Sequence, residues 1–570
     1  MRHIVIIGLV VVAAASTAFA QKTRREPVYR NAVVAADHAL ASQAGLEMLK
    51  AGGNVVDAAV ATSFALSVVR PASCGIGGGG FMVVWDAEKQ ESVALDYRER
   101  APLRATRNMY VEANKRGTKT SEYGHLAIGV PGTVAGLCFA AKHHGSLPLA
   151  KLLEPAIRLA RDGVPIDQNE RNVQKSVLAA FEKMPGAKTK YANLIKGYLN
   201  AGKPWTDEDR FRSPQLAALE LIAKDGVDAY YKGPIRDAIV TESRRGGGIL
   251  SLDDFKDAQP VVRKPLVGSF DEFRILTMPP PSSGGVAIIQ ILNFLDEWES
   301  QHPGNRIEDL VRNSPEFAHL LIEAMKHAFA DRAEYLGDMD FADVPVDRLM
   351  RRDYAKGLLA KFDPTQTKPK DVYGRFAPIE DSGTSHISVI DKHGNAVACT
   401  ETINTSFGSK VVEPRFGIVL NNQMDDFVAV PGQPNVFGLI QSAANAVEPR
   451  KKPLSSMSPT IVLEDGKARF VAGASGGPRI ISATLQVLLN QMRFGMTPAQ
   501  AVAYPRVHHQ WLPNVLNVEN GVGLGLREGL KRRGHSVVQK SVGVSQSVSR
   551  SKEGLRGASD PRKYGRPAGY

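Results

Sequence analysis

The stretch Gly383-Thr384-Ser385-His386-Ile387-Ser388-Val389-Ile390-Asp391-Lys392-His393-Gly394-Asn395 decides the fold of this chain. Residues 387–390 form a strand-like run, and residues 391–395 have the composition of a tight turn. A second strand-like run follows over residues 396–403. The segment therefore predicts a β-hairpin with Gly383 and Thr384 at its mouth.

A hydroxyl residue directly after a glycine, at the mouth of a hairpin, is what a self-cleaving N-terminal nucleophile needs. Because Gly383 has no Cβ, the peptide bond before Thr384 can be approached closely and held in a strained conformation. Cleavage would give Thr384 an α-amino group with a pKa of about 7.7–8.0. Such an amine can deprotonate the residue's own hydroxyl near neutral pH. Taken alone, the segment more simply indicates an ordinary hairpin preceded by a turn glycine.

The first twenty residues differ in character from the rest of the chain. Arg2 and His3 precede the apolar run 4–15, and Ala18-Phe19-Ala20 fits a small-x-small cleavage site. Residues 1–20 are therefore expected to be a secretory signal peptide, since the run is too short to span a bilayer. No later segment reaches eighteen apolar residues, so we expect no membrane span after signal removal and a periplasmic or secreted protein.

Composition is that of a globular protein with a large core: 570 residues, 43% hydrophobic and 23% charged. The net charge is +12, and residues 527–570 hold eleven Lys and Arg against three acids. In an exported protein this basic balance indicates a solvated surface rather than a nucleic-acid site. The three cysteines, Cys74, Cys138 and Cys399, match no metal-site spacing and exclude a disulfide framework.

Helical patterns dominate the first 380 residues, and strand patterns follow Thr384. Residues 54–69 and the run after Ser314-Pro315 predict helices, the second with Ser as N-cap and Pro at the first helical position. Residues 459–463 and 468–472 predict paired strands, and a helix is expected over 479–493. This order suggests sheets covered by helices, a layered α/β body.

Two glycine-rich motifs invite functional readings. Residues 75–80 satisfy G-x-G-x-x-G, but a helix precedes them and a strand follows, the reverse of a dinucleotide site. Residues 473–477 satisfy G-x-S-x-G between a strand and a helix, which suits a Ser475 nucleophile elbow, although no acid and histidine follow in a supporting arrangement. We favour a second use, in which Gly476 and Gly477 open a helix and their N–H groups stabilise an oxyanion.

Three polar stretches complete the set of candidate motifs. Residues 421–427 place acids between apolar neighbours, where a buried carboxylate would require a cationic partner such as a ligand ammonium. Residues 454–459 form a polar patch before a strand, and Arg98 follows a short apolar run. Each is weak alone, since a cap cluster or a surface ion pair explains it equally well.

Taken together, these stretches resemble the γ-glutamyltranspeptidases of the N-terminal nucleophile (Ntn) hydrolase superfamily, over nearly the whole chain after the signal peptide. Many ordered matches are far more specific than any single motif. The matching segments are residues 53–59, 96–99, 279–285, 383–386, 421–427, 453–460, 505–510 and 557–562.

The resemblance implies an α/β fold, the αββα four-layer sandwich, made as an inactive precursor. It implies autocleavage between Gly383 and Thr384 into a large subunit, residues 21–383, and a small catalytic subunit, residues 384–570. These would remain together as a heterodimer. Neither a cofactor nor a metal is expected. The substrates would be glutathione and other γ-glutamyl compounds, with water, amino acids or dipeptides as acceptors.

The family pattern also implies roles for individual residues. Thr384 would be the nucleophile for maturation and turnover, with its α-amino group as general base and Thr402 orienting its hydroxyl. Gly476 and Gly477 would supply oxyanion N–H groups. The donor's α-carboxylate would be bound by Arg98, Ser455 and Ser456, and its α-ammonium by Asn404, Gln423 and Asp426.

One segment and three rivals qualify this interpretation. Residues 430–447 have the length and composition of the family's lid, with Phe437 where relatives commonly carry Tyr. A cephalosporin (glutaryl) acylase-like amidase shares autocleavage but has no need for an ammonium pocket. The other rivals are a Ser475 serine hydrolase and a non-catalytic periplasmic peptide-binding protein.

Overall fold

The predicted hairpin forms the middle of a seven-stranded antiparallel sheet in a computed structural model that describes residues 26–116, 118–257, 259–376, 383–428 and 442–570. Strand β9 pairs with β10 and with β1, and β10 also pairs with β2. In spatial order the strands are β20 (Ala568–Gly569), β1 (Ala32–Ala36), β9 (Ser385–Asp391), β10 (Ala396–Thr402), β2 (Gly79–Asp86), β3 (Glu91–Asp96) and β6 (Val261–Arg263).

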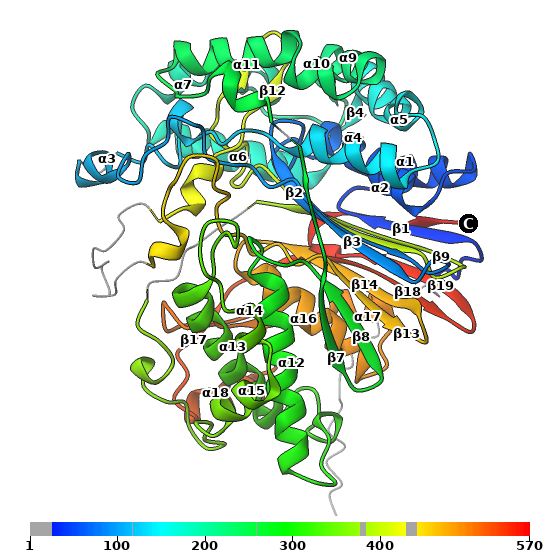
Figure 1. The fold of residues 1–570 in the computed structure, drawn as a ribbon, viewed down its shortest axis with the longest axis vertical. Coiled ribbons are helices and arrows are strands. Elements are labelled where there is room, and N and C mark those ends of the chain that lie inside the picture. Colours follow the sequence, from blue (N-terminus) through cyan, green and yellow to red (C-terminus); the bar gives the residue numbers. More distant parts are fainter. Residues whose placement is uncertain (1–25, 117, 258, 377–382, 429–441) are drawn as a thin grey trace, which may run out of the picture.

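A second antiparallel sheet of six strands stacks on the first (Figure 1). Its centre is the second predicted strand pair, which the structure confirms with bounds shifted by a residue or more at several ends. The spatial order is β19 (Gly554–Ser559), β18 (Val544–Ser551), β14 (Lys467–Ser475), β13 (Thr460–Glu464), β8 (Phe273–Thr277) and β7 (Leu266–Phe270).

Alternation along the strands builds the interface between the two sheets. In β9, Ile387 and Val389 face the covering helices, whereas Ile390 joins a buried cluster shared by both sheets. That cluster includes Trp85 of β2 and Val471 of β14. Because side chains of a strand alternate between faces, each sheet presents one face to its partner and one to helices.

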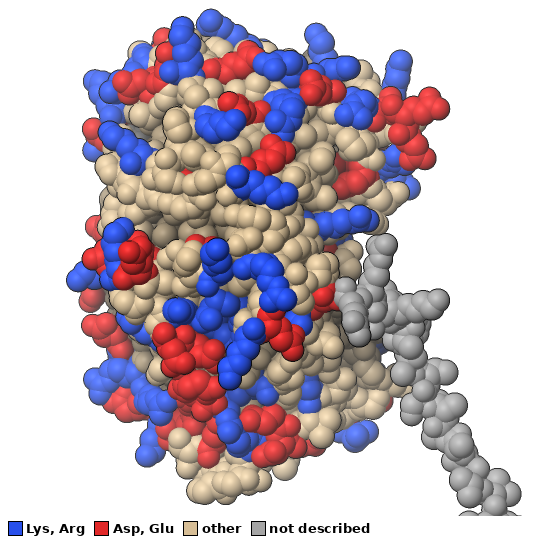
Figure 2. Space-filling view, turned by 90° about the vertical axis from the view of Figure 1, so that its right-hand side faces the viewer, with Lys and Arg blue, Asp and Glu red and all other residues tan. Residues whose placement is uncertain are grey.

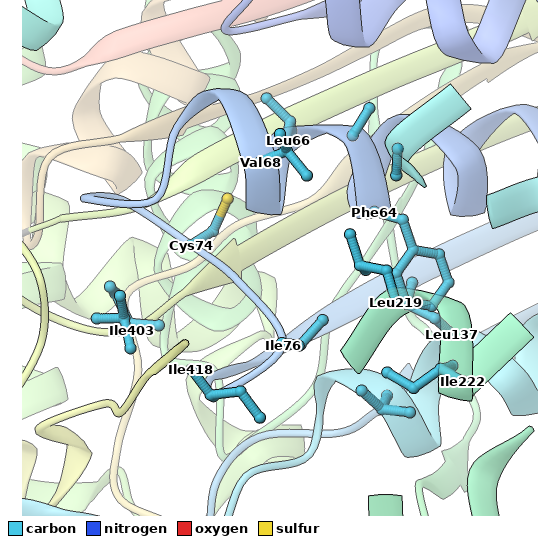
Figure 3. Close-up of a cluster of buried hydrophobic side chains, with 14 of the residues drawn as sticks. Phe64, Leu66, Val68, Cys74, Ile76, Leu137, Leu219, Ile222, Ile403 and Ile418 are labelled. Carbon is cyan, nitrogen blue, oxygen red and sulfur yellow. The ribbon is translucent and has the colours of Figure 1, made fainter. Parts of the chain in front are cut away.

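One helical layer covers the outer face of the seven-stranded sheet (Figure 1). Helix α2 confirms the prediction for residues 54–69: Asn54 caps it in a capping box with Asp57, and every residue from Val55 to Val69 is buried. It is apolar all round because it lies between the sheet and outer helices, where Phe64 packs with Leu137 and Leu219 (Figure 3). The main helices of this layer are α1 (Ala39–Lys50), α2 (Val55–Val69), α4 (Thr133–His144), α5 (Leu149–Asp162), α6 (Gln168–Glu182), α9 (Leu216–Asp225), α10 (Val227–Tyr231) and α11 (Pro234–Arg245).

The second helical layer packs on the six-stranded sheet and completes an αββα sandwich. Ser314 accepts a hydrogen bond from Phe317 N and Pro315 begins α13, as predicted. The layer comprises α12 (Gly284–Gln301), α13 (Pro315–Tyr335), α14 (Val346–Leu349), α15 (Arg352–Leu359), α16 (Arg479–Met492) and α17 (Pro498–Ala503). A small sheet of β15 (Val507–His508), β16 (Leu516–Val518) and β17 (Val537–Gln539), with helix α18 (Leu524–Arg532), lies at its rim.

The first 380 residues contain more strands than the helical patterns suggested. β1 is a five-residue run of Ala and Val that is buried on both faces, so it has no alternation to detect. β7 and β8 are equally short and precede the long helix α12. Consequently both sheets combine strands from before and after Thr384, and the two parts of the chain share one core.

Charge on the visible face is mixed in sign (Figure 2): basic and acidic side chains are interspersed over the helical layers. That pattern agrees with the expectation of a solvated surface for the basic excess. Among the described residues, no helix combines the length and apolarity that crossing a bilayer requires. The predicted signal peptide, residues 1–20, lies outside them.

The contact between the two sheets at Gly473 gives a test of the sandwich. A Cβ at Gly473 of β14 would lie 2.2 Å from Cε1 of His386 on β9. We expect Gly473→Ala to cost about 1–3 kcal/mol of stability by overpacking and to lower the midpoint of thermal unfolding. Gly357→Ala is the matched control, because Gly357 is exposed in α15 with no atom within 4 Å of its Cβ position. Equal midpoints for the two variants would contradict the packing described.

Candidate active site

Thr384 lies at the mouth of the hairpin, where two hydroxyl groups converge on one carbonyl oxygen. The Thr384 hydroxyl donates to the carbonyl oxygen of Gly383 at 2.6 Å, and Thr402 Oγ1 donates to the same oxygen. Thr402, the last residue of β10, in turn accepts from Asn404 N at 2.8 Å. Both threonine residues are 2% exposed. The family pattern had predicted that Thr402 contacts the Thr384 hydroxyl. In the intact chain, Thr402 instead donates to the Gly383 carbonyl.

The backbone at this point requires glycine. Gly383 has φ +92°, and a Cβ on it would lie 2.1 Å from the carbonyl oxygen of Asn404. Any other residue would be displaced by that contact and strained by the positive φ. Asn404 has a positive φ of 73° as well. The peptide bond before Thr384 thus follows one residue with a positive φ angle, Gly383, which lies against a second, Asn404.

His386, the histidine nearest to Thr384 in the sequence, has its ring nitrogens engaged elsewhere. His386 is two residues away, but its ring nitrogens lie 2.7 Å from Thr400 Oγ1 and 3.0 Å from Ser388 Oγ. Burial between the sheets lowers the pKa of His386 to about 3, so the ring is neutral at physiological pH. His386 is therefore not placed as a base for the Thr384 hydroxyl, and the use of the residue's own α-amino group stays a prediction.

The G-x-S-x-G motif forms the predicted turn between β14 and α16. Gly476 and Gly477 have φ +127° and +65° and precede the helix that starts at Arg479. Among the described residues, the hydrogen bond of the Ser475 hydroxyl goes to the carbonyl oxygen of Val544, at 3.5 Å, and not to a histidine. The oxyanion role of Gly476 and Gly477 stays a prediction, whereas Ser475 lacks, among the described residues, the histidine partner that a serine nucleophile needs.

The residues predicted to bind a donor amino acid form a connected, buried set. Arg98 Nη2 lies 2.5 Å from Asp426 Oδ2, and Gln423 Nε2 donates to that same oxygen. Arg98 also donates from Nε to the carbonyl oxygen of Pro453. Asn404 Nδ2 donates to the carbonyl oxygen of Asn422, beside Gln423. The structure therefore brings Arg98, Asn404, Gln423 and Asp426 together, although segments far apart in the sequence supply them.

Three polar atoms of this set have no hydrogen-bond partner within the described part of the chain: Arg98 Nη1, Asn404 Oδ1 and Gln423 Oε1. Their residues are at most 3% exposed. Leaving buried polar groups unsatisfied costs about 1–3 kcal/mol each. The set offers one cationic donor and two neutral acceptors, which is the complement of a ligand that carries a carboxylate and an ammonium group.

Ser455 and Ser456 lie where the segments 279–285 and 453–459 meet. Ser282 and Ser455 form an isolated parallel bridge, and the hydroxyl of Ser283 donates to the Ser455 carbonyl at 2.6 Å. Arg332 of α13 donates to Ser283 Oγ at 2.9 Å and to Ser456 Oγ at 3.1 Å. Ser455 and Ser456 are completely buried. The structure joins them to Arg98 through the neighbouring Leu454 carbonyl, which accepts from Arg98 Nη2.

The glycine run 75–80 is a close-packed turn, as the sequence left open. Cβ atoms on Gly77 and Gly78 would lie 2.1 Å from the carbonyl oxygens of Val419 and Thr402. Asn421 Nδ2 donates to the Gly77 carbonyl at 2.9 Å. Because these glycines lack a Cβ, the loop packs directly against β10 and against the segment before Gln423. It thereby holds in place two segments that carry predicted site residues. The order helix α2, turn, strand β2 confirms that this is no dinucleotide motif.

Several residues that shape the site had no signal in the sequence. Lys563 Nζ donates to the carbonyl oxygen of Thr384 at 3.0 Å, and Asn445 Nδ2 donates to that of Asp426 at 2.7 Å. Arg332 is a third example. Arg332 and Lys563 lie outside the candidate motifs, and Asn445 lies in the predicted lid segment, where the sequence did not single it out. The predicted lid, residues 430–447, lies largely outside the described residues, as does Phe437.

Glu401 is a fourth such residue, on the helix-facing side of β10 beside Thr402. It is 1% exposed and accepts from Tyr97 OH at 3.1 Å and from the hydroxyl of Ser63. Burial raises the pKa of Glu401 to about 7, against the lowering effect of those two hydrogen bonds. The carboxyl group ties α2 and the end of β3 to the strand that carries Thr402.

One group of side chains has metal-ligand character, and it is separate from Thr384. The ligand atoms of His319, Glu323 and His535 lie within 4.8 Å of one another, in the helical layer of α13. Glu323 is already paired with Lys326 Nζ at 2.9 Å and accepts from Thr367 and Tyr373. A buried ammonium group thus neutralises the only carboxylate of this group, which makes it a poor cation site.

The αββα layers, with a hydroxyl residue after a glycine at the central hairpin, define the class of Ntn hydrolases. The narrower assignment comes from comparison with known proteins: the family model described as "Gamma-glutamyltranspeptidase" matches residues 41–570. The chain belongs to the γ-glutamyltranspeptidase family, and it is an enzyme of that type.

Individual relatives agree with this placement. The chain is 42% identical over 539 residues to the glutathione hydrolase proenzyme of Escherichia coli K12, covering 94% of this chain and 90% of the relative. A cephalosporin acylase from Bacillus halodurans superposes with a TM-score of 0.83 at 28% identity, covering 98% and 99% of the two chains. A γ-glutamyltranspeptidase structure from Helicobacter pylori is 40% identical over 58% of this chain and 92% of its own, with a TM-score of 0.53.

These findings confirm the predicted family and fold. They also rank the alternative functions by how well each agrees with the relatives. The acylase shares the architecture but is more distant in sequence than the glutathione hydrolase relatives, so it remains the weaker alternative. A Ser475 hydrolase and a non-catalytic binding protein do not agree with the family. The roles of individual residues are not decided by similarity and are proposed below.

The buried carboxyl of Glu401 predicts a pH dependence of stability. Its pKa in the folded chain, about 7, exceeds its ordinary value of 4.5. Between these values the folded state holds a proton that the unfolded state has lost, so stability falls as the pH rises through that window. Glu401→Gln cannot ionise and escapes this loss, which amounts to at most about 3 kcal/mol.

We therefore expect Glu401→Gln to gain stability relative to the parent chain when the pH rises from 5 to 8. Urea unfolding at both pH values measures it, in a Thr384→Ala background so that one uncleaved chain unfolds. Parallel pH curves for parent and variant would show that Glu401 is not the group responsible.

Proposed function

We propose that the chain cleaves its own Gly383–Thr384 bond and then acts as a γ-glutamyltransferase and glutathione hydrolase with Thr384 as nucleophile. The observation that carries the proposal is the position of the Thr384 hydroxyl, 2.6 Å from the oxygen of the carbonyl group that it would attack. The glutathione hydrolase relatives named proenzymes support both parts. The products would be a large subunit of residues 21–383 and a small subunit of residues 384–570, held together by the shared sheets.

Maturation begins with attack of Thr384 Oγ on the carbonyl carbon of Gly383. Negative charge develops on the Gly383 oxygen, where the hydroxyl of Thr402 already donates. The Thr384 nitrogen leaves with a proton, which converts the peptide bond into an ester between Gly383 and Thr384 Oγ. Water then hydrolyses the ester and leaves a carboxylate on Gly383 and a free α-amino group on Thr384.

Movement of the new Gly383 carboxylate away from Thr384 after cleavage would change the partner of Thr402. Its hydroxyl loses the carbonyl acceptor that it shares with Thr384 Oγ1. The oxygen left beside it is that of the Thr384 hydroxyl. Thr402 would thus stabilise the oxyanion during cleavage and orient the nucleophile afterwards, which reconciles the family pattern with the contacts of the intact chain.

In turnover, the α-amino group takes the proton of the Thr384 hydroxyl, which attacks the γ-carbonyl carbon of the donor. The N–H groups of Gly476 and Gly477 would stabilise the oxyanion. The α-ammonium group of Thr384 would then give its proton to the nitrogen of the donor's scissile amide, which leaves as an amine. The γ-glutamyl ester on Thr384 then reacts with water or with the amine of an amino acid or dipeptide. Loss of one oxyanion donor would slow the reaction by about 10²–10³-fold.

Donor recognition follows from the unsatisfied atoms of the buried set. Arg98 Nη1 and the serines Ser455 and Ser456 would bind the α-carboxylate, as a guanidinium does in bidentate fashion. Asn404, Gln423 and Asp426 would bind the α-ammonium, which needs acceptors only. Arg98 and Asp426, which pair with each other at 2.5 Å in the free chain, complement the two charges of an amino-acid zwitterion.

Export completes the proposal. The predicted signal peptide at residues 1–20 would direct the precursor to the periplasm or outside the cell, where no cofactor is required for this chemistry.

Nucleophile identity is tested by Thr384→Ala beside Ser475→Ala. We expect Thr384→Ala to stay a single chain on a denaturing gel and to release no p-nitroaniline from a γ-glutamyl anilide. Ser475→Ala should yield two fragments and keep activity within about threefold. N-terminal sequencing of the small fragment should begin at Thr384. A fragment that starts elsewhere, or an active Thr384→Ala chain, would refute the assignment.

The ammonium pocket separates this function from that of a glutaryl acylase, which the structural likeness to the cephalosporin acylase keeps in view. A glutaryl anilide lacks only the α-ammonium group of the γ-glutamyl anilide. Without it, the buried acceptors Asn404 Oδ1 and Gln423 Oε1 stay unsatisfied. We expect kcat/KM for the γ-glutamyl anilide to be greater by at least about 10²-fold. A ratio near one would favour the acylase interpretation.

A further inference from the structure

Lys563, seven residues before the final Tyr570, contacts the residue that carries the proposed nucleophile. Its Nζ donates to the Thr384 carbonyl oxygen at 3.0 Å, to Asp37 Oδ2 at 2.6 Å and to Ser73 Oγ at 3.2 Å. The side chain is 10% exposed, and that of Asp37 is not exposed at all. All three donor hydrogens of the ammonium group are thereby used.

The partners of Lys563 are themselves fixed. Asp37 Oδ1 accepts from Gln546 Nε2 at 2.5 Å, so both carboxylate oxygens are held. Arg70 Nη2 donates to the backbone carbonyl of Lys563 at 3.1 Å and binds Asp167 Oδ2 at 2.5 Å. A lysine held at its backbone and at its ammonium group has little freedom left, and it can therefore position what it touches.

Thr384 needs such an anchor once the chain is cut. In the precursor, the peptide bond to Gly383 fixes Thr384 on one side and β9, which begins at Ser385, fixes it on the other. Cleavage removes the first constraint. The hydrogen bond from Lys563 to the Thr384 carbonyl then limits rotation about the Cα–C bond, and with it the direction of the α-amino group and of the hydroxyl.

We propose that Lys563 is a positioning residue of the reaction, which holds the Thr384 backbone and keeps the α-amino group in its neutral, proton-accepting form. The proposal rests on Thr384 as the nucleophile. The α-amino group and the carbonyl group that Lys563 holds sit on the same Cα atom. A cation there disfavours a second positive charge on the amine.

Asp37 opposes this effect from farther away, because Lys563 stands between it and Thr384. The elements packed around Lys563 and Asp37 carry other charged or titratable groups. These are His38, Arg70, Asp167, Glu170, Cys74 and Glu401. Removing the Lys563 ammonium would leave the Asp37 carboxylate facing the amine, so the lost cation and the exposed anion both raise the pKa of the amine.

The test compares Lys563→Met, Lys563→Arg and Lys326→Met. Lys326 is the matched control, because it is also a buried lysine paired with a carboxylate, at 2.9 Å from Glu323, but it belongs to α13 in the other layer. For each variant we would measure the fraction cleaved, the thermal midpoint, and kcat and KM per cleaved chain between pH 5 and 10.

We expect Lys563→Met to lower kcat per cleaved chain at least tenfold at pH 7 with KM within about threefold. The acid limb of its kcat/KM profile should move upward by about one pH unit. Lys563→Arg should restore most of kcat and the position of the limb. Lys326→Met should lose thermal stability but keep the parental kcat and the parental position of the acid limb.

A kcat within twofold of the parent enzyme for Lys563→Met would overturn the proposal, as would an unmoved acid limb. If Lys563→Met does not fold or does not cleave, Lys563→Arg decides: near-parental cleavage and kcat support the positioning role, and their loss refutes it. Cleavage of a Thr384→Ala chain would instead refute the proposed function itself.

Discussion

The pairing of β9 with β10 is the interaction on which the rest of this enzyme depends. It brings Thr384 and Thr402 to the same end of the hairpin, where both hydroxyls reach the Gly383 carbonyl. The flanking strands β1 and β2 hold the hairpin in the middle of the sheet. Because it is buried on both faces, its register is strongly specified, since a slip by one residue would turn Thr402 toward the helices.

The buried polar set next to the hairpin lowers the stability of the free enzyme, because some of its polar atoms lack hydrogen-bond partners among the described residues. A stable protein satisfies nearly all of its buried donors and acceptors. Here Arg98 Nη1, Asn404 Oδ1 and Gln423 Oε1 lack partners among the described residues. In the proposed function, a zwitterionic donor would satisfy all three atoms together, and a ligand without one of the two charges would not. Selectivity would then follow from unfavourable terms in the free enzyme as much as from favourable contacts.

Local patterns in the sequence predicted the elements that they themselves determine. The hairpin at Thr384, the capped helix after Asn54 and the Ser314 cap of α13 follow from neighbouring residues. β1 was missed because a strand buried on both faces does not alternate. The candidate site residues were named through family resemblance, whereas Lys563, Arg332 and Glu401 act through contacts over many residues that no local pattern records.

The interleaving of the strands explains how one bond can break in the middle of a core without loss of the fold. Both sheets contain strands from before Gly383 and strands from after Thr384, so neither segment can complete its sheets alone. In the intact chain, Thr402 donates to the Gly383 carbonyl and Lys563 donates to the Thr384 carbonyl, one on each side of the bond proposed to break. Under the proposed mechanism, the contacts that hold this bond for cleavage would also hold the Thr384 end of the product for catalysis.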